Sequence, residues 1–136
     1  MEAFGVAASA LALVGLAAEL VGALIQVKRA FRSEAEVLQL ANEIAEVELV
    51  LKRLSRLPQE IPPGSNPDID ILEDCVLRIE LRLKEVQDIV QRRLDSKNFL
   101  DKLNMEKRHT TSLKTIQQDF SSIRDRISLQ MQALTM

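Results

Sequence analysis

Apolar residues recur along most of this chain at the spacing of helices that bury one face. Between residues 33 and 57 they fall at Val37, Leu40, Ile44, Val47, Leu51 and Leu54. Steps of three and four residues keep these side chains on a single helical face. The segment predicts an amphipathic helix with Ser33 as its N-cap and Leu57–Pro58 at its end.

Two later segments carry the same pattern. In the first, Asp68 or Asp70 is a candidate cap, and the apolar positions are Leu72, Val76, Ile79, Leu83, Val86, Val90 and Leu94. In the second, which we expect to start near Asn104, they are Leu113, Ile116, Phe120, Ile123, Ile127 and Leu134. Residues 95–98 indicate a break between the two helices. Residues 58–68 hold every proline of the chain and predict a mobile loop.

Residues 3–32 are apolar nearly all round, which is typical of a helix in the middle of a bundle or in lipid. The four segments together predict an all-α fold. We expect an antiparallel bundle of about four helices with a central, very apolar N-terminal helix. The length fits a single domain over residues 1–136.

Composition supports helices and excludes several kinds of site. The chain has four Gly, four Pro and neither Trp nor Tyr, and its net charge of -2 argues against a nucleic-acid partner. The single cysteine, Cys75, has helical apolar neighbours and is expected to be a buried structural thiol. We find no phosphate-binding loop, nucleophile elbow or metal-ligand spacing. The sequence therefore predicts a non-enzyme with no metal and no cofactor.

Charge is distributed unevenly along the chain. Residues 58–91 carry eight acidic and three basic side chains, whereas residues 92–136 carry nine basic and five acidic ones. The simpler interpretation is that helices of opposite sign pack side by side. The alternative places the basic end beside acidic lipid headgroups or an acidic partner helix.

The opening segment allows three interpretations. A cleaved signal is disfavoured, because Glu2 precedes the apolar run and the basic residues follow it. A permanent transmembrane helix would place Glu19 in hydrocarbon at a cost of about 2–3 kcal/mol. A soluble bundle covers all the apolar stripes at once and is the favoured interpretation.

Gly5, Gly15 and Gly22 require an explanation, because each glycine inside a helix costs roughly 0.5–1 kcal/mol relative to alanine. Small residues let helices approach closely, either in a soluble bundle or within a membrane. Close packing in the bundle is the simpler interpretation for each glycine. Together they permit a second use, in which the helix leaves the bundle and enters a membrane on activation.

The run "GVAASALALVGLAAELV" (residues 5–21) resembles the start of the fungal N-terminal domain of STAND proteins, the HeLo-like domain, including the glutamate at Glu19. The resemblance continues through "LANEIAEVELVLKRL", "LEDCVLRIELRLKEV" and "DFSSIRDRISLQMQAL", which are generic amphipathic segments. It departs after Leu94, where "DSKNFLDKL" replaces a segment that contains Trp or Pro in many members.

This resemblance implies an effector domain of a NOD-like receptor or amyloid-signalling protein. Such domains act in regulated cell death, including heterokaryon incompatibility and innate immunity, by oligomerising and permeabilising the plasma membrane through the N-terminal helix. Carried onto this chain, the inserting residues would be Phe4, Gly5, Val6, Leu11, Leu13, Val14, Gly15, Leu16, Leu20, Val21, Gly22, Leu24 and Ile25. Lys28, Arg29 and Arg32 would form a basic cytoplasmic anchor.

Three functions follow as hypotheses. The first is the membrane-active effector, cytoplasmic at rest and at the plasma membrane on activation. Its expected partners are further copies of the chain, membrane lipids including anionic ones, and the other domains of a receptor if the chain is a fragment. The second is an adaptor that binds through helix–helix contacts without insertion. The third is a small membrane protein with the first helix permanently inserted.

Overall fold

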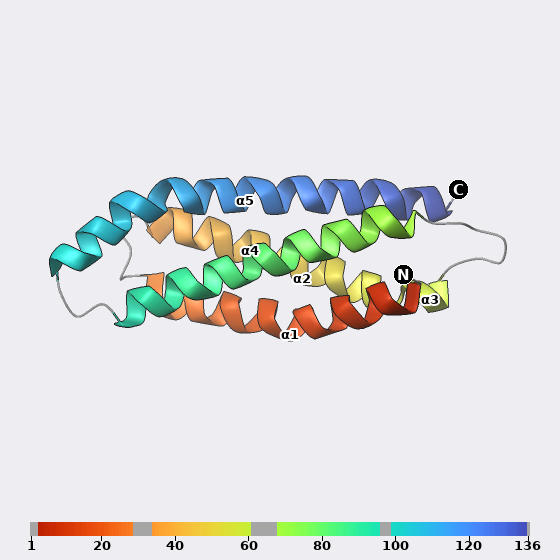
Figure 1. The fold of residues 1–136 in the computed structure, drawn as a ribbon, viewed down its shortest axis with the longest axis horizontal. Helices are drawn as coiled ribbons and strands as arrows, with labels where there is room; N and C mark the ends of the chain where they lie inside the picture. Colours follow the sequence, from red (N-terminus) through yellow and green to blue (C-terminus); the bar gives the residue numbers. More distant parts are fainter. Residues whose placement is uncertain (1–2, 29–33, 61–67, 96–98, 136) are drawn as a thin grey trace.

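The computed structural model describes residues 3–28, 34–60, 68–95 and 99–135, and the helical bundle predicted from the sequence is confirmed. Its long helices are α1 (Ala3–Val27), α2 (Glu34–Ser55), α4 (Ile69–Asp95) and α5 (Phe99–Thr135), and a single helical turn, α3 (Leu57–Glu60), follows α2 (Figure 1). The helices lie lengthwise beside one another and enclose one apolar core.

The predicted stripes form that core. The six positions expected on α2 are all between 0% and 1% exposed, and Phe120 of α5 is completely buried. On α4, the expected positions from Leu72 to Val90 are buried as well. Leu94 and Leu134 lie outside the residues whose side chains are described. Near the end of α5, Met131 continues the buried stripe, while Gln130 is half-buried.

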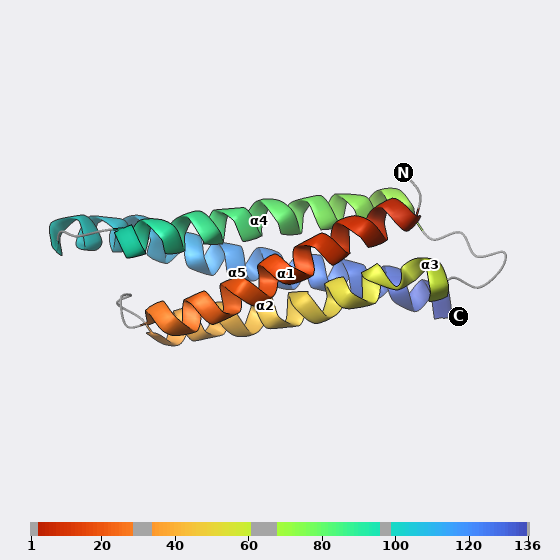
Figure 2. The same ribbon diagram turned by 90° about the horizontal axis from the view of Figure 1, so that it is seen from below.

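Long helices that follow one another in the chain run antiparallel, whereas the packed pairs α1–α4 and α2–α5 run parallel. Contacts join α1 to α2 and α4, and α5 to the same two helices, so α2 and α4 lie on one diagonal of the bundle. Along the α2–α5 contact, Glu36 pairs with Lys114 and Glu43 with Arg124, so both numbers rise together. Two antiparallel hairpins, α1–α2 and α4–α5, are therefore packed with their first helices parallel (Figures 1 and 2).

Local hydrogen bonds explain two helix ends. The backbone N–H of Ile71 donates to Asp68 Oδ1 at 3.3 Å, and that of Leu72 donates to the Asp68 carbonyl at 3.2 Å. Asp68 is thus the N-cap of α4, one of the two residues expected. At the end of α2, the Ser55 hydroxyl donates to the Lys52 carbonyl at 2.6 Å and satisfies a carbonyl that the helix leaves free.

Three predicted boundaries differ from the structure. The loop expected at 58–68 is shorter, because the completely buried Leu57 anchors α3, where Pro58 stands at a first-turn position that needs no N–H donor. The fourth helix begins at Phe99, before the expected Asn104. Helix α1 ends at Val27, whereas we expected it to continue to about residue 32. Residues 29–33, 61–67 and 96–98, with Ser33, lie outside the described chain.

Helix α1 contacts three other helices of the bundle but is not covered on every side. Helix α1 packs on α2, α4 and the turn α3, and its remaining face is open to solvent (Figure 2). The buried face of α1 forms part of the core together with α2, α4 and α5. The high apolar content of α1 therefore does not arise from being surrounded.

Candidate membrane-active helix

Helix α1 presents two different faces. Its buried face packs into the core and consists of Val6, Ala7, Ala10, Leu13, Ala17, Leu20, Leu24 and Val27. Its exposed face consists of Ala8, Leu11, Ala12, Gly15, Ala18, Glu19, Gly22, Ile25 and Gln26. Only two residues of the exposed face, Glu19 and Gln26, are strongly polar. The exposed face is therefore apolar without being covered by another part of the described chain.

The length of α1 matches a membrane. Gly5–Val27 is a stretch of 23 residues with a mean hydropathy of 2.1, which is long and apolar enough to cross a bilayer. By length and composition alone, the core helix of a soluble protein or a signal sequence passes the same test. A core helix is mostly buried, however, and only 28% of the most apolar window of this segment is buried. Burial in the bundle thus explains only a part of the hydropathy.

A stripe of small and polar residues runs along the exposed face. Its members, at steps of four and three, are Ala8, Ala12, Gly15, Glu19, Gly22 and Gln26. Such steps place the six side chains on one helical face. Glu19, the only acidic residue of the apolar segment, therefore shares a face with the two glycines and projects into solvent.

The glycines of this stripe do not serve close packing in the bundle. A Cβ atom built on Gly15 or on Gly22 would meet no other atom within 4 Å. The simpler interpretation from the sequence, that these glycines let bundle helices approach one another, is wrong for both positions. Gly5 is half-buried. Neither exposed glycine is required by the bundle, although each weakens the helix relative to alanine.

The residues assigned to insertion by the resemblance divide between the two faces. Leu11, Gly15, Gly22 and Ile25 are exposed, Gly5, Val14, Leu16 and Val21 are half-buried, and Val6, Leu13, Leu20 and Leu24 are buried. Insertion of the whole helix therefore requires that the last four leave the core. The side chain of Phe4 lies outside the described part of the chain. In the basic anchor, Lys28 is half-buried, and Arg29 and Arg32 lie outside the described residues.

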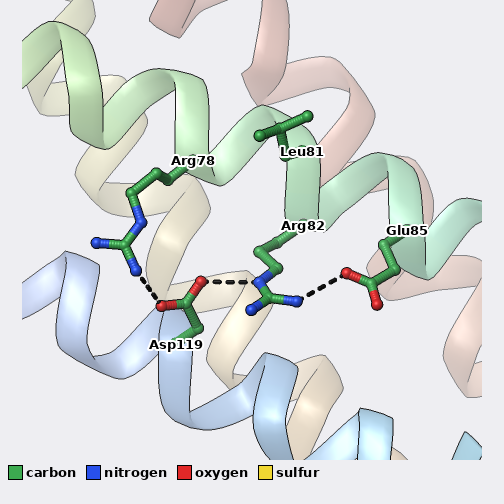
Figure 3. A pocket seen from close by; sticks show the side chains of 5 residues that line it. All are labelled: Arg78, Leu81, Arg82, Glu85 and Asp119. Atoms are coloured by element: carbon green, nitrogen blue, oxygen red, sulfur yellow. Dashed lines mark hydrogen bonds and ion pairs between the residues drawn. The ribbon is translucent and has the colours of Figure 1, made fainter.

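Ion pairs join the other three long helices. Asp119 of α5 accepts hydrogen bonds from Arg78 and from Arg82 Nε of α4, the latter at 2.8 Å, and Arg82 also pairs with Glu85 (Figure 3). The hydrogen bonds to Asp119 and Glu85 raise the pKa of Arg82. These residues line a shallow open depression, and the arginines are neutralised by the adjoining carboxylates. The sequence pattern did not single out this cluster, because its members are 37 and 41 residues apart.

A second cross-helix pair joins α2 to α5. Arg124 forms a two-pronged contact with Glu43, with Nε–Oε1 and Nη2–Oε2 distances of 2.9 and 3.3 Å. The hydrogen bonding that Arg124 donates to Glu43 is the main cause of the raised pKa of Arg124. In contrast, Glu19 of α1 and Lys28, which directly follows α1, make no ion pair with another described residue. Helix α1 is thus held by apolar contacts.

The remaining candidate chemistry is structural. Cys75 is completely buried, as expected, and burial is the main cause of the raised pKa of its thiol. Within residues 3–28, 34–60, 68–95 and 99–135, no three His, Cys, Asp or Glu side chains are grouped to hold a metal ion. No family model matches the sequence, and no curated protein or solved structure matches the chain.

Proposed function

We propose that this chain is a membrane-active effector domain of the kind implied by its resemblance to HeLo-like domains. The observation that supports the proposal is the exposed face of α1. This helix is long enough to span a bilayer and largely uncovered, its described residues make no ion pair, and its exposed face is lined by small residues, so few contacts oppose its release. In the proposed active state, several copies assemble, α1 leaves the bundle, and lipid replaces the core around Leu13, Leu20 and Leu24.

The small-residue stripe provides a surface through which α1 helices of different copies would pack in the proposed membrane state. In a bilayer, helices associate through close packing at small residues, because lipid tails already satisfy apolar side chains. Gly15 and Gly22 would lie at such contacts between copies. Glu19 would then face neighbouring helices or water instead of hydrocarbon, which avoids the cost of about 2–3 kcal/mol expected for a lipid-facing carboxylate.

The exposure of Leu11 permits a test that does not depend on disrupting the core. Leu11 is 63% exposed, so we expect Leu11→Lys to change the free energy of unfolding by less than about 0.5 kcal/mol. A lysine at this depth opposes insertion by about 2.5–3.5 kcal/mol. The measurement is dye leakage from phosphatidylcholine liposomes, with and without phosphatidylserine, after the chain is clustered through a fused inducible oligomerisation domain.

A matched control is Leu129→Lys, which makes the same change at a 65% exposed position on α5. Leakage by the native chain and by Leu129→Lys, together with its loss in Leu11→Lys, supports the proposal. If the clustered and folded native chain releases no dye, α1 stays in the bundle and the adaptor becomes the better proposal. Circular dichroism and thermal melting establish that each variant is folded.

A further inference from the structure

Helix α4 carries two exposed leucines on its outer surface. Leu77 and Leu81 are 53% and 68% exposed and lie one helical turn apart. Leu77, Glu73 and Glu80 of α4 line a small groove between α4 and α1, to which α1 contributes Val6 and Ser9. Figure 3 shows Leu81 pointing away from Asp119 of α5. We call Glu73, Leu77, Glu80 and Leu81 the acidic patch.

The charge of the acidic patch restricts what covers it. Glu73 makes no ion pair with another described residue, while Glu80, whose side chain is 38% exposed, contacts Lys84 at 3.2 Å. The rim beside Leu77 is acidic, and the arginines beside Leu81 are neutralised by Asp119 and Glu85, so this surface does not attract anionic lipid or nucleic acid. It complements a protein surface that presents an apolar side chain next to basic ones.

Such a surface occurs on α2 of the same chain. Leu49 is 54% exposed and is followed at helical spacing by the exposed residues Lys52, Arg53 and Arg56. Lys52 contacts Glu48 at 3.4 Å, whereas neither Arg53 nor Arg56 pairs with an acidic side chain in the described ranges. We call Leu49, Lys52, Arg53 and Arg56 the basic patch.

The fold places the two patches where they cannot meet within one molecule. Helices α2 and α4 lie on a diagonal of the bundle, so their outer faces point in opposite directions (Figure 2). The patches are nevertheless at the same end of the bundle, because one occupies the last turns of α2 and the other the first half of α4 (Figure 1). The basic patch is therefore available only to another molecule.

We propose that the basic patch of one copy docks on the acidic patch of the next, so that the chain assembles into a head-to-tail row. The two contacting helices run antiparallel when neighbouring bundles point the same way, since α2 and α4 have opposite directions in each molecule. Leucines at the centre and opposite charges at the rim match the usual anatomy of a protein interface. A contact between different surfaces on opposite sides does not close into a dimer; it continues as an open row or a ring.

This inference deepens the proposed function, because it assigns a surface to the self-association on which that function rests. The acidic patch borders α1 near its N-terminal end, at Val6 and Ser9, whereas the exposed face of α1 from Leu11 to Gln26 contributes no residue to either patch or to the groove. Assembly in this way brings many copies of that face to one side of the row.

Two charge-reversal variants of the full chain test the proposal. Arg53→Glu/Arg56→Glu makes the basic patch acidic, and Glu73→Lys/Glu80→Lys makes the acidic patch basic. Sedimentation velocity over a range of concentrations is measured in about 0.01 M and about 0.15 M salt, where screening differs strongly. We expect the native chain to grow in mass without a plateau at low salt, and each variant to associate roughly tenfold or more weakly.

Mixing the two variants separates a lost interface from a lost fold. One variant then offers two acidic surfaces and the other two basic ones, so the mixture is expected to assemble although neither variant does so alone. Asp125→Lys, at an exposed position on α5 outside both patches, is the control and is expected to assemble like the native chain. Restored assembly in the mixture supports the proposal. A native chain that stays monomeric at low salt, or assembly unchanged in either variant, overturns it.

The same variants distinguish this inference from the membrane proposal. Leu11→Lys alters neither patch and is expected to form rows while failing to release dye. Rows without leakage from the native chain would contradict the membrane function and leave the interface standing. Leakage from a native chain that forms no row would support the membrane function and contradict the interface.

Discussion

Asp119 shows how much one carboxylate can organise in this bundle. It lies between Arg78 and Arg82, and its side chain is only 14% exposed. Both arginines come from the acidic segment of the chain and Asp119 from the basic segment, so the pairing is opposite to the overall sign of the two helices. The local partner of a charge is decided by the contact between helices and not by the average charge of a segment.

We expect Asp119→Asn to lower the free energy of unfolding by about 1–2 kcal/mol, because it weakens hydrogen bonds to two charged groups in a half-buried position. The arginines are partly solvated, which keeps the loss below that of a fully buried pair. Urea unfolding followed by circular dichroism measures the change. Asp125→Asn, at an exposed position of the same helix, is the control and should change stability by less than about 0.5 kcal/mol.

Cys75 gives a pH-dependent prediction. Its folded pKa is raised above the usual value of 9.0, mainly by burial, so the folded protein keeps a proton that the unfolded chain releases. The folded state therefore keeps its full stability while the pH stays below the pKa of this thiol in the unfolded chain. The folded state loses stability as the pH rises above about 8.5–9. We expect slow alkylation of the native thiol by iodoacetamide near pH 8 and fast alkylation in urea. Equal rates in the two states would contradict the burial of this side chain.

At the scale of the element, α1 has one face built to pack and another that the bundle does not use. Ala10 and Ala17 are completely buried, and alanine at these positions lets α1 lie close to its neighbours. On the opposite face, Ala12 and Gly15 have no neighbour that restricts their size. Substitutions that enlarge a side chain should therefore act in opposite ways on the two faces.

Ala17→Leu is expected to destabilise the native chain by about 1–3 kcal/mol, because the added methyl groups overpack a buried contact. If release of α1 activates the protein, liposome leakage should begin at lower protein concentration. Ala12→Leu adds the same atoms on the exposed face and is the matched control, with little change in stability. Thermal melts and dye release are measured on both variants. Similar melting temperatures for the two would contradict the assignment of the faces.

Gly15→Ala should stabilise the bundle by roughly 0.5–1 kcal/mol, because alanine favours the helix and its Cβ meets open space. The proposed membrane state makes the opposite demand, since a larger residue hinders close approach between helices. We therefore expect a higher melting temperature together with weaker leakage. A lower melting temperature would reveal a contact at this position.

At the scale of the whole molecule, α5 joins two helices that lie on opposite sides of the bundle. Its ion pairs reach Glu43 on α2 and Asp74, Arg78 and Arg82 on α4, so it connects the two diagonal helices. Helix α1 forms the fourth side of the bundle, and its described residues join the other helices through apolar contacts. Helices α2, α4 and α5 are linked by ion pairs as well as by apolar packing.

Hydrogen exchange should report this difference. Under native conditions we expect the amides of α1 to exchange at least about tenfold faster than those in the middle of α2, α4 and α5, since opening α1 breaks no ion pair among the described residues. Mass spectrometry of peptides covering each helix gives the measurement. Uniform protection of all four helices would show that the bundle opens only as a whole.

The apolar spacing determined the helices, because positions three and four residues apart can be buried together only on a helical face. The stripes of α2, α4 and α5 followed from local pattern alone, and the same pattern narrowed the cap of α4 to Asp68 or Asp70, of which the structure identifies Asp68. The helical turn at Leu57–Glu60 did not, because the proline that suggests a loop is also accepted in the first turn of a helix.

Only the tertiary structure decided which helices are neighbours, which face of α1 is covered, and where opposite charges meet. An all-round apolar sequence has no periodicity from which to read a buried face, so the exposure of Leu11, Gly15 and Gly22 was invisible in the sequence. Likewise, the diagonal placement of α2 and α4 depends on how the two hairpins pack. That packing places the basic and acidic patches on opposite sides of one molecule, and no local pattern contains this information.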